Sequence, residues 1–570
     1  MKKLIAFLFF ISGNYIYGQA IDSLNQSLTY FELIKEYKIL DQKYDNAALI
    51  TYGKTDCGLN LQLFIISGNG IFQPQSLHEL GKVILFINNG IHPGEPDGMD
   101  ASLKFAKKIL QDTTAKRYLE NVVICIVPVL NIDGALNRNS TSRVNQNGPV
   151  EYGFRGNAKN LDLNRDFIKT DASNTHSLKA ILQQWEPDVF VDTHVSDGAD
   201  YQYTMTLIST QHNKLNPILG TFLHDSFTPA LLNAMKDKND EMIPYVAPLN
   251  EESSPDSGIV AFLETPRFLS GYMAAHNCFS FITESHMLKP FSERVKSMMN
   301  FLSTILAFTA ENKTEILNRR KAATEYDEHL KWYPYNFEVD MTKKDSIYFN
   351  GYNAEYLPSK ITGLQRLKYN HDKPFRKKIG FYNDYSAKDS VEIPNNFFVP
   401  QAYENIVRML ELNGATINRI AQDSTANCKS IYIDDYTTTS APYEGHYLHS
   451  NVRSHSIDEK IWMKRGDYLV STKQKSLRTI METLMPDAVD SYFCWGFFDS
   501  ILQEKEWFSS YVFEDLADLL LKKDELLAAK FTNWKKDHPK ADSYSQLYFI
   551  YQNSPYFEKG FKRYPIRLLY

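Results

Sequence analysis

Residues 82–95 read KVILFINNGIHPGE, and this stretch decides the fold. The apolar run 82–87 is rich in β-branched and aromatic residues, which predicts a strand buried on both faces. Apolar residues then recur at helical spacing over 98–111, which predicts an amphipathic helix. A buried strand followed by a helix is the repeating unit of α/β sheets.

The same alternation continues to about residue 310. Residues 122–130, 188–192 and 279–283 predict further buried strands, and a helix that includes Leu178 and Trp185 ends before Pro187. The predicted fold class is therefore α/β, with a mixed, mostly parallel twisted sheet flanked by helices. In such sheets, functional sites gather beyond the carboxyl ends of the strands.

A chain of 570 residues is too long for one hydrophobic core, so we expect two or three domains. We predict an α/β domain over residues 20–320 and an accessory C-terminal region over 321–570, which forms one or two mixed α/β domains. In the second part, short alternating runs over 325–369 and 430–475 predict strands. Residues 399–413 predict a helix, and 497–537 predict mainly helical structure.

The N-terminus has the layout of a secretory signal peptide. Lys2 and Lys3 precede a short apolar stretch, which ends in small and polar residues. This run is too short to span a bilayer, and no later segment resembles a membrane span. We therefore expect residues 1–19 to be removed and the protein to be secreted or periplasmic.

The charge balance excludes a general affinity for nucleic acid. The formal charge is −6, and it becomes −8 without Lys2 and Lys3. We interpret the basic run 373–378 as a solvated turn. The five cysteines are widely spaced and form no metal or redox motif.

Several polar residues fall at or near the ends of the predicted strands. His92 and Glu95 are three residues apart on a loop after one strand, and Pro93–Gly94 permits a tight turn between them. His194 ends a buried strand, and Glu284 lies inside the apolar strand-like stretch 280–284, where a carboxylate is costly unless it is paired or functional. Each alone is compatible with an ordinary polar residue of a loop or core. Together, two imidazoles and a carboxylate can hold zinc and leave a fourth position open for water.

Two further groups of polar residues accompany these segments. The segment 162–165 reads DLNR, and Arg155 lies nine residues before Asn164. His446, His449 and His455 form a second histidine cluster, which we interpret as part of a surface loop because its spacing is a weak metal signal.

Taken together and in this order, the segments over about residues 45–300 resemble the zinc carboxypeptidase family, of the carboxypeptidase A and B type. The stretch 265–294 also resembles a secreted bacterial branch with long C-terminal extensions. The resemblance implies that His92, Glu95 and His194 hold one zinc ion per chain. The resemblance also implies that residues 20–320 form the catalytic domain.

The resemblance also implies roles for the remaining residues. Asn164 and Arg165 correspond to the pair that binds the terminal carboxylate of a peptide substrate, and Asp162 to the residue that orients His92. Arg155 corresponds to the residue that stabilises the oxyanion, and Glu284 to the catalytic glutamate.

The chain departs from the family pattern before Glu284. The best candidate for the family's mobile tyrosine is Tyr272, which lies only twelve residues upstream of Glu284. Arg267, in the same segment, fits either a substrate contact or an ordinary salt bridge.

The sequence leaves three functional hypotheses open. The first is a secreted metallocarboxypeptidase, which acts on peptides with a free C-terminal carboxylate. The second is a zinc deacylase or amidase, which acts on N-acyl amino acids or on cell-wall peptides. The third is a binding protein that uses an inactive peptidase fold, although every matched position is intact.

Overall fold

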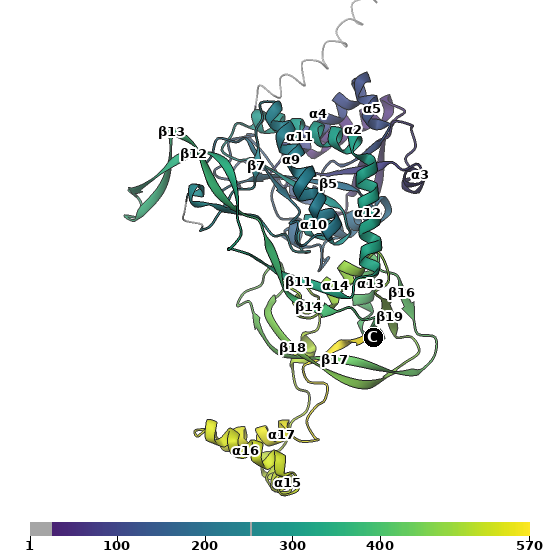
Figure 1. Cartoon of the computed structure of the whole chain (residues 1–570), viewed down its shortest axis with the longest axis vertical. Coiled ribbons are helices and arrows are strands. Elements are labelled where there is room, and N and C mark those ends of the chain that lie inside the picture. The colour runs from purple at the N-terminus through teal and green to yellow at the C-terminus, as the bar shows by residue number, and fades with distance from the viewer. Residues whose placement is uncertain (1–24, 251–253) are drawn as a thin grey trace, which may run out of the picture.

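The structure is a computed structural model that describes residues 25–250 and 254–570 (Figure 1). The predicted signal peptide, residues 1–19, lies outside the described residues. Within the described part of the chain, none of the helices is both long and apolar enough to cross a lipid bilayer.

The first part of the chain is built on an eight-stranded mixed sheet, as its strand pattern predicts. Its strands, in spatial order, are β1 (Ala47–Lys54), β2 (Asn60–Ile66), β4 (Val122–Val127), β3 (Val83–Asn88), β5 (Val189–Ser196), β10 (Phe279–His286), β6 (Met205–Ser209) and β7 (Ile243–Pro244). The central strands β4, β3, β5 and β10 are parallel, whereas β1 and β2 pair antiparallel with their neighbours. Strand β6 is antiparallel to β10 and parallel to β7. The predicted fold class is confirmed.

Helices cover both faces of this sheet (Figure 1). They are α2 (Tyr30–Lys43), α3 (Pro74–Glu79), α4 (Asp97–Gln111), α5 (Lys116–Leu119), α6 (Ile132–Leu136), α7 (Ser173–Trp185), α8 (Pro217–Phe222), α9 (Thr228–Asp237), α10 (Leu269–Ala275), α11 (Phe291–Glu311) and α12 (Lys313–Glu328). Helices α2, α4, α9 and α11 contribute to one hydrophobic core, and α3, α7 and α10 contribute to the other.

Strand β3 shows why an unbroken apolar run is needed at the centre of the sheet. Side chains alternate across a strand. Val83, Leu85 and Ile87 enter the core beside α4 and α11, while Ile84 and Phe86 enter the core beside α7. Every residue of this strand is buried.

The strand ends differ from the predicted ones in ways that matter for the site. Strand β4 ends at Val127 instead of residue 130, whereas β5 continues from the predicted end at 192 to Ser196. Strand β10 continues to His286. His194 and Glu284 therefore lie within strands, where neighbouring strands fix their directions.

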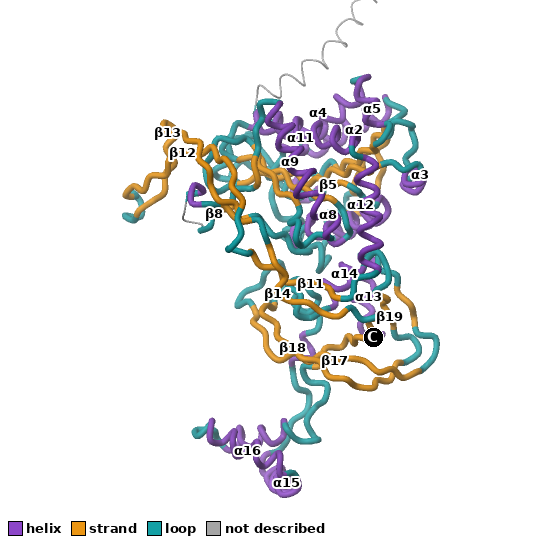
Figure 2. The backbone as a smooth tube through the Cα atoms, viewed as in Figure 1, coloured by secondary structure: helices purple, strands orange, loops and turns teal. Residues whose placement is uncertain are grey.

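The C-terminal region forms three further sheets, one of which also includes two short strands from the first part of the chain (Figure 2). The strand pair is β11 (Trp332–Val339) with β14 (Tyr385–Glu392), and the four-stranded sheet has the order β12 (Asp345–Pro358), β13 (Gln365–Tyr382), β9 (Ile259–Val260), β8 (Ala247–Pro248). The six-stranded sheet has the order β16 (Ile417–Arg419), β19 (Tyr468–Ser471), β15 (Asn396–Val399), β20 (Arg563–Leu569), β17 (Ser424–Thr438), β18 (His449–Met463). Helices α13 (Glu404–Leu412) and α14 (Leu477–Leu484) pack on this last sheet.

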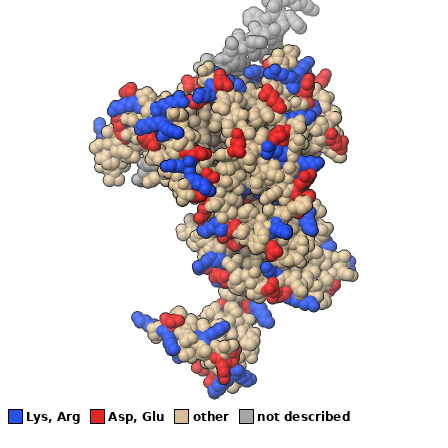
Figure 3. All heavy atoms as spheres, viewed as in Figure 1, with Lys and Arg blue, Asp and Glu red and all other residues tan. Residues whose placement is uncertain are grey.

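Two parts of the C-terminal region project from the body. The hairpin β12–β13 extends to one side, and Lys and Arg side chains gather on it (Figure 3). The sequence predicts a turn at the basic run 373–378, but these residues belong to strand β13. Their charged side chains are exposed to solvent. Helices α15 (Ser510–Lys523), α16 (Glu525–Asp537) and α17 (Ser543–Gln552) form a separate small module with its own apolar core.

Helix α12 joins the two halves of the chain. The predicted boundary at residue 320 lies inside this helix, whose Ile316 and Ala323 pack in a core of the eight-stranded sheet. Asp327, near its end, forms a buried bidentate pair with Arg478 of α14, at 2.9 and 3.0 Å. The buried charges compensate one another only while both halves are in contact.

A histidine and an aspartate also connect the halves. His446 Nε2 lies 2.7 Å from Asp171 Oδ2, and its Nδ1 lies 2.8 Å from the carbonyl oxygen of Trp495. The hydrogen bond that His446 donates to Asp171 raises the pKa of His446 above 6.5, against the opposing effect of burial. Burial opposes ionisation of Asp171 as well, but the bond from His446 and the charge of Lys169 hold its pKa below 3.8.

These shifts predict a pH-dependent contribution to stability. A raised histidine pKa gives stability that is fully present below about pH 6.5 and is lost as the pH rises through the folded-state value. We expect the wild-type protein to lose up to about 1 kcal/mol more than His446→Gln between about pH 6 and pH 9. Urea denaturation at both pH values measures this difference, and an identical pH dependence in the two proteins would contradict it.

Candidate zinc site

Three strands of the eight-stranded sheet place the polar residues of the site at one edge. His92 and Glu95 lie on the loop after β3, His194 lies near the end of β5, and Glu284 lies in β10. Strands β5 and β10 are parallel, and Glu284 is in register with His194. Residues paired in this way point to the same face of a sheet, so the two side chains face one cavity.

His92, Glu95 and His194 come together as one buried group. Their nitrogen and carboxylate donor atoms all lie within 4.8 Å of one another. His194 Nδ1 is 3.1 Å from Glu95 Oε2, and His92 Nδ1 is 3.4 Å from Glu95 Oε1. It is the one such group among the residues that the structure describes.

The donor set fits a zinc ion. His92 Nδ1 is buried and forms no hydrogen bond with the described residues, so a buried lone pair or proton is left without a partner. An unsatisfied imidazole nitrogen beside a carboxylate and a second imidazole is the arrangement that a bound cation satisfies. Two histidines and one glutamate are a known catalytic zinc ligand set.

The turn that carries His92 and Glu95 depends on close packing around glycines. The N–H of Glu95 donates to the carbonyl oxygen of His92 at 2.9 Å, which closes the turn. A Cβ at Gly94 would lie 2.9 Å from the side chain of Arg143. At Gly98, the first turn of α4 approaches β5 so closely that a Cβ would overlap with Thr193.

Carboxylates orient both histidines from the far side. Asp162 Oδ1 lies 2.9 Å from His92 Nε2, and Asp192 Oδ2 lies 2.8 Å from His194 Nε2. These contacts occupy the second nitrogen of each ring and leave Nδ1 directed at the ligand group, as carboxylate–histidine–zinc arrangements require. The sequence motifs include Asp162 but not Asp192, because alternating apolar neighbours hide Asp192 inside a strand.

Two arginines balance the buried charge of Glu95. Arg143 Nη1 is 2.8 Å from Glu95 Oε1, and Arg155 Nη1 is 3.4 Å from the same oxygen. Burial alone would raise the pKa of Glu95, but the charges of His92 and Arg143 hold it well below its ordinary range. Arg143 lies in a polar loop, where nothing in the sequence distinguishes it from other surface arginines.

Glu284 lines the same cavity without an ion-pair partner. Burial raises its pKa to about 8, and the nearby charge of Glu95 acts in the same direction, while His194 and two arginines oppose the rise. A carboxylate with a high proton affinity beside a candidate metal group is suited to general acid–base chemistry.

Asn164 and Arg165 also line the cavity. Asn164 Oδ1 accepts a hydrogen bond from the N–H of Leu269 at 2.9 Å, so the amide group of Asn164 is held at a fixed orientation. The Arg165 guanidinium lies over the ring of Phe268, 4.3 Å from its centroid. The fixed amide and the stacked guanidinium present donors to an anionic group in the cavity.

The structure corrects the assignment of Tyr272. This residue lies in α10 within the hydrophobic core, fully buried, and its hydroxyl accepts a hydrogen bond from Gln183 Nε2 at 3.3 Å. It does not line the cavity, whose tyrosine is instead Tyr245. The apolar residues of 269–275 draw this helix into the core, which sequence spacing alone does not reveal.

Arg267 is a salt-bridge residue and not a cavity residue. Its Nε lies 2.6 Å from Asp490 Oδ1, and its backbone N–H donates to the other oxygen of the same carboxylate. The guanidinium also packs against the ring of Trp495, 5.2 Å from its centroid. It therefore ties the loop before α10 to the C-terminal region.

The cavity has a volume of about 330 Å³ and combines these groups with apolar walls. Sequence motifs did not indicate Tyr245, Asp197 or Glu264, which also line it. Its remaining apolar residues are Val195, Ile208, Phe262, Phe268 and Ile282.

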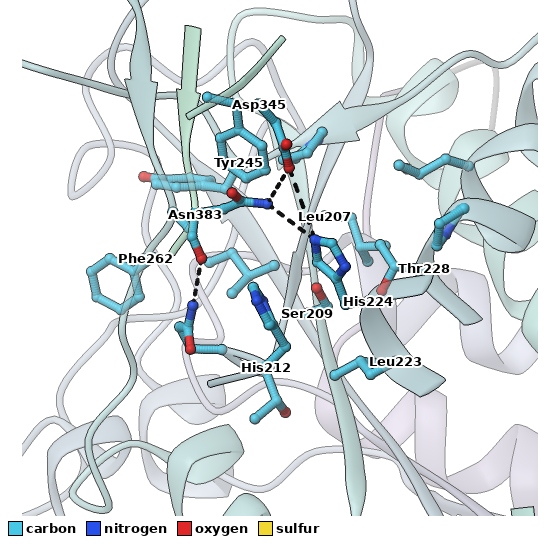
Figure 4. Close-up of a pocket in the computed structure, with 18 of the residues that line it drawn as sticks. Leu207, Ser209, His212, Leu223, His224, Thr228, Tyr245, Phe262, Asp345 and Asn383 are labelled. Atoms are coloured by element: carbon cyan, nitrogen blue, oxygen red, sulfur yellow. Dashed lines mark hydrogen bonds and ion pairs between the residues drawn. The ribbon is translucent and has the colours of Figure 1, made fainter. Parts of the chain in front are cut away.

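A second cavity of about 320 Å³ adjoins the first, and the two share Ile208, Tyr245 and Phe262. Figure 4 shows its polar side, where Asn383 and Asp345 approach His224. The rings of His212 and His224 lie 4.2 Å apart, and burial together with the charge of His224 lowers the pKa of His212 to about 4. His212 is therefore neutral near neutral pH.

The C-terminal region contacts Asp162, the residue that orients the candidate ligand His92. Glu444 Oε2 accepts a hydrogen bond of 2.7 Å from the backbone N–H of Asp162. Asp162 in turn bonds to Arg155 Nε at 2.8 Å and to His92. The orientation of His92 thus depends on a residue that lies more than 280 positions away.

The second histidine cluster does not converge. His446, His449 and His455 bond to three different carboxylates, those of Asp171, Asp499 and Asp434. Each imidazole therefore has its own local partner.

Comparisons with known proteins agree with the geometry. Residues 34–208 match the family model described as zinc carboxypeptidase. A protein from Trichophyton rubrum named carboxypeptidase 2 is 20% identical over 435 residues, which cover 73% of this chain and 74% of that protein. Carboxypeptidase 2 of Trichophyton equinum is 21% identical over 436 residues, with the same coverage. A crystal structure of a metallo-carboxypeptidase from Burkholderia cenocepacia covers 48% of this chain and 68% of its own, at 16% identity and a TM-score of 0.37.

The matched segment contains all three candidate ligands, together with Arg155, Asn164 and Arg165. The chain is accordingly a metal-dependent peptide hydrolase by class. Residues 34–208 match the zinc carboxypeptidase family, which the sequence motifs had indicated.

The contact between Asp162 and His92 predicts the behaviour of Asp162→Asn. Loss of the carboxylate charge weakens the orientation of His92, so we expect zinc affinity to fall about 10- to 100-fold. Competition with a chromogenic chelator measures this affinity. Asp197→Asn is the control, because Asp197 is exposed and lines the same cavity. An equal loss in both variants would contradict a specific role for Asp162.

The contact with Glu444 makes a separate prediction. Glu444→Ala leaves the Asp162 N–H without its acceptor, and we expect zinc affinity to fall by up to about tenfold. Glu444→Gln keeps an oxygen acceptor and should retain most of the affinity. Wild-type affinity in the alanine variant would show that the C-terminal contact does not influence the ligands.

Proposed function

We propose that this protein hydrolyses the C-terminal peptide bond of peptides, with one zinc ion per chain and Glu284 as the general base. The proposal rests on one observation above all. A single cavity brings together the candidate ligands, a half-buried carboxylate at Glu284 and donors for an anionic group at Asn164 and Arg165.

His92, Glu95 and His194 would hold the zinc ion, which lowers the pKa of a bound water and polarises a carbonyl group. Glu284 accepts a proton from the attacking water and delivers it to the departing amine. Its place in the cavity beside the candidate ligands supports this role, and its raised pKa of about 8 reflects a high proton affinity.

The arginines and Asn164 account for the position of cleavage. Arg165 and Asn164 bind the terminal carboxylate of the substrate, which restricts hydrolysis to the last bond. Arg155 pairs with Glu95 and Asp162, but its side chain is 45% exposed and lines the cavity, where it would also donate to the oxyanion that forms at the scissile carbonyl.

The N-terminal sequence, in which Lys2 and Lys3 precede a short apolar stretch as in a signal peptide, supports a secreted or periplasmic location. We propose the catalytic domain over residues 20–320 and an accessory region over 321–570, with α12 shared between them. The contact between Glu444 and Asp162 supports a structural role for the accessory region in the site.

A deacylase or amidase that acts on N-acyl amino acids or cell-wall peptides is the alternative. Its substrates also carry a carboxylate and a scissile amide, so the same side chains would serve. Parallel assays with an N-acyl amino acid and a tetrapeptide distinguish it from a carboxypeptidase.

The test of the proposal is mass spectrometry of a defined peptide mixture after incubation with the zinc-loaded protein. We expect peptides shortened from the C-terminus, and a rate about 100- to 10,000-fold lower for Glu284→Gln, which removes the base and keeps the side-chain shape. Zinc content measured in both proteins controls for loss of the metal.

Peptides with an amidated C-terminus provide a matched substrate control. They lack the carboxylate for Asn164 and Arg165, so they should stay intact. Efficient trimming of amidated peptides, or hydrolysis by Glu284→Gln at the wild-type rate, would refute the proposed mechanism.

A further inference from the structure

The hairpin β12–β13 carries a charge opposite to that of the whole chain. Residues 345–382 contain seven Lys and Arg residues and three acidic ones, a net charge of +4, whereas the chain carries −6. All seven basic residues are exposed, and they gather on the hairpin where it projects from the body (Figure 3). A local excess of cations on an acidic protein indicates a surface for an anionic partner.

Only the base of the hairpin packs against the rest of the protein. Phe349 and Ile379 belong to a small apolar core with Tyr201, and Gln202 Nε2 donates to the carbonyl oxygen of Gly351 at 2.9 Å. Farther out, over residues 353–370, the two strands pair only with each other among the strands that the structure describes. A two-stranded hairpin is marginally stable in water without a further surface to pack on, so this outer half would gain stability from a partner.

The tip of the hairpin, residues 359–364, exposes two large apolar side chains. Ile361 is 93% exposed and Leu364 is 71% exposed. Ser359 holds the turn, because its N–H donates to the carbonyl oxygen of Leu364 at 2.8 Å. Its Oγ accepts hydrogen bonds from the N–H groups of Ile361 and Thr362 at 3.2 and 3.1 Å. These backbone groups already have partners, which lowers the cost of moving the tip out of water.

Basic residues border this tip. Lys360 lies within it, and Arg366 and Lys368 follow on β13. None of these three forms an ion pair with any described residue, whereas Lys373, nearer the base, pairs with Glu355 at 2.9 Å. The cations without a compensating acid therefore lie beside the exposed apolar side chains.

Apolar side chains bordered by such cations are complementary to an anionic lipid surface. The cations attract lipid phosphates, and the apolar side chains enter the boundary between headgroups and acyl chains. An acidic polysaccharide would account for the charges but not for Ile361 and Leu364. An apolar groove on another protein would account for these two residues but not for the charges around them.

We propose that the hairpin β12–β13 docks the protein on an anionic lipid surface, with the apolar tip in the headgroup boundary and its bordering cations on lipid phosphates. The contact is peripheral, because only the tip enters the lipid. It is independent of the proposed hydrolysis, since none of the tip residues lines the catalytic cavity.

The test is co-sedimentation of the purified protein with two kinds of vesicle, one of phosphatidylcholine alone and one of phosphatidylcholine and phosphatidylglycerol in equal parts. We expect binding to the anionic vesicles to be tighter by about tenfold or more. A rise in NaCl from about 0.05 to about 0.5 M screens the charges and should weaken this binding by about tenfold or more. Equal binding to both kinds of vesicle, or binding to neither, would overturn the proposal.

Two variants separate the charges from the apolar tip. In Lys360→Gln/Arg366→Gln/Lys368→Gln, affinity for the anionic vesicles should fall about 10- to 100-fold. In Ile361→Ser/Leu364→Ser, which keeps every charge, it should fall by about tenfold or more. Wild-type binding by the second variant would refute a lipid partner, because a site for a soluble polyanion would then explain the charges.

The module α15–α17 offers matched controls, because it also projects from the body. Tyr511→Ser/Leu526→Ser removes side chains that are 83% and 77% exposed, and Lys523→Gln/Lys530→Gln/Lys536→Gln removes three exposed charges. Both controls should bind anionic vesicles within about twofold of the wild type. A loss in the controls equal to that in the hairpin variants would overturn the role of the hairpin. A Tm within about 2 °C of the wild-type value shows that each variant is folded.

Discussion

The short contact between Asp162 and His92 is the interaction on which the site depends. It directs one ring nitrogen away from the cavity and leaves the other to face Glu95 and His194. Asp162 is itself held by Arg155 through its side chain and by Glu444 through its backbone. Burial opposes the ionisation of Asp162, but the charges of His92 and Arg155 lower its pKa far enough to keep it ionised. The candidate ligand group is thus stabilised by contacts from both halves of the chain.

The sheet provides the rigidity that this arrangement needs. Because β3, β5 and β10 are parallel and buried, their registers fix where the loop with His92, the side chain of His194 and the side chain of Glu284 meet. A shift of one residue in β10 would turn Glu284 to the opposite face. The apolar residues along these strands therefore determine the geometry of the polar ones, and any change in their packing is transmitted to the cavity.

The sequence was sufficient to predict the sheet and the positions of His92, Glu95, His194 and Glu284, because periodicity and short motifs are local signals. It was misleading for Tyr272, since the burial of α10 depends on contacts with distant residues such as Gln183. Arg143, Asp192 and Glu264 carry no local signal at all. An arginine in a loop or an acid in an apolar segment becomes meaningful only when the fold brings a partner to it, or leaves it without one. The sequence also predicts that β5 ends too early, at residue 192 instead of Ser196, because contacts with neighbouring strands stabilise its polar last residues.

The place of β20 in the six-stranded sheet has a consequence for how the protein matures. This strand lies between β15 and β17, and the helices α15–α17 precede it in the chain. During synthesis or export, β15 and β17 lack their common neighbour until residues 563–569 have emerged. The hairpin of β17 and β18, which carries Glu444, therefore has its full set of neighbours only when this last strand is in place. Proteolysis near the C-terminus would leave the catalytic sheet complete but would remove the strand that pairs with β17, on the hairpin that supports Asp162.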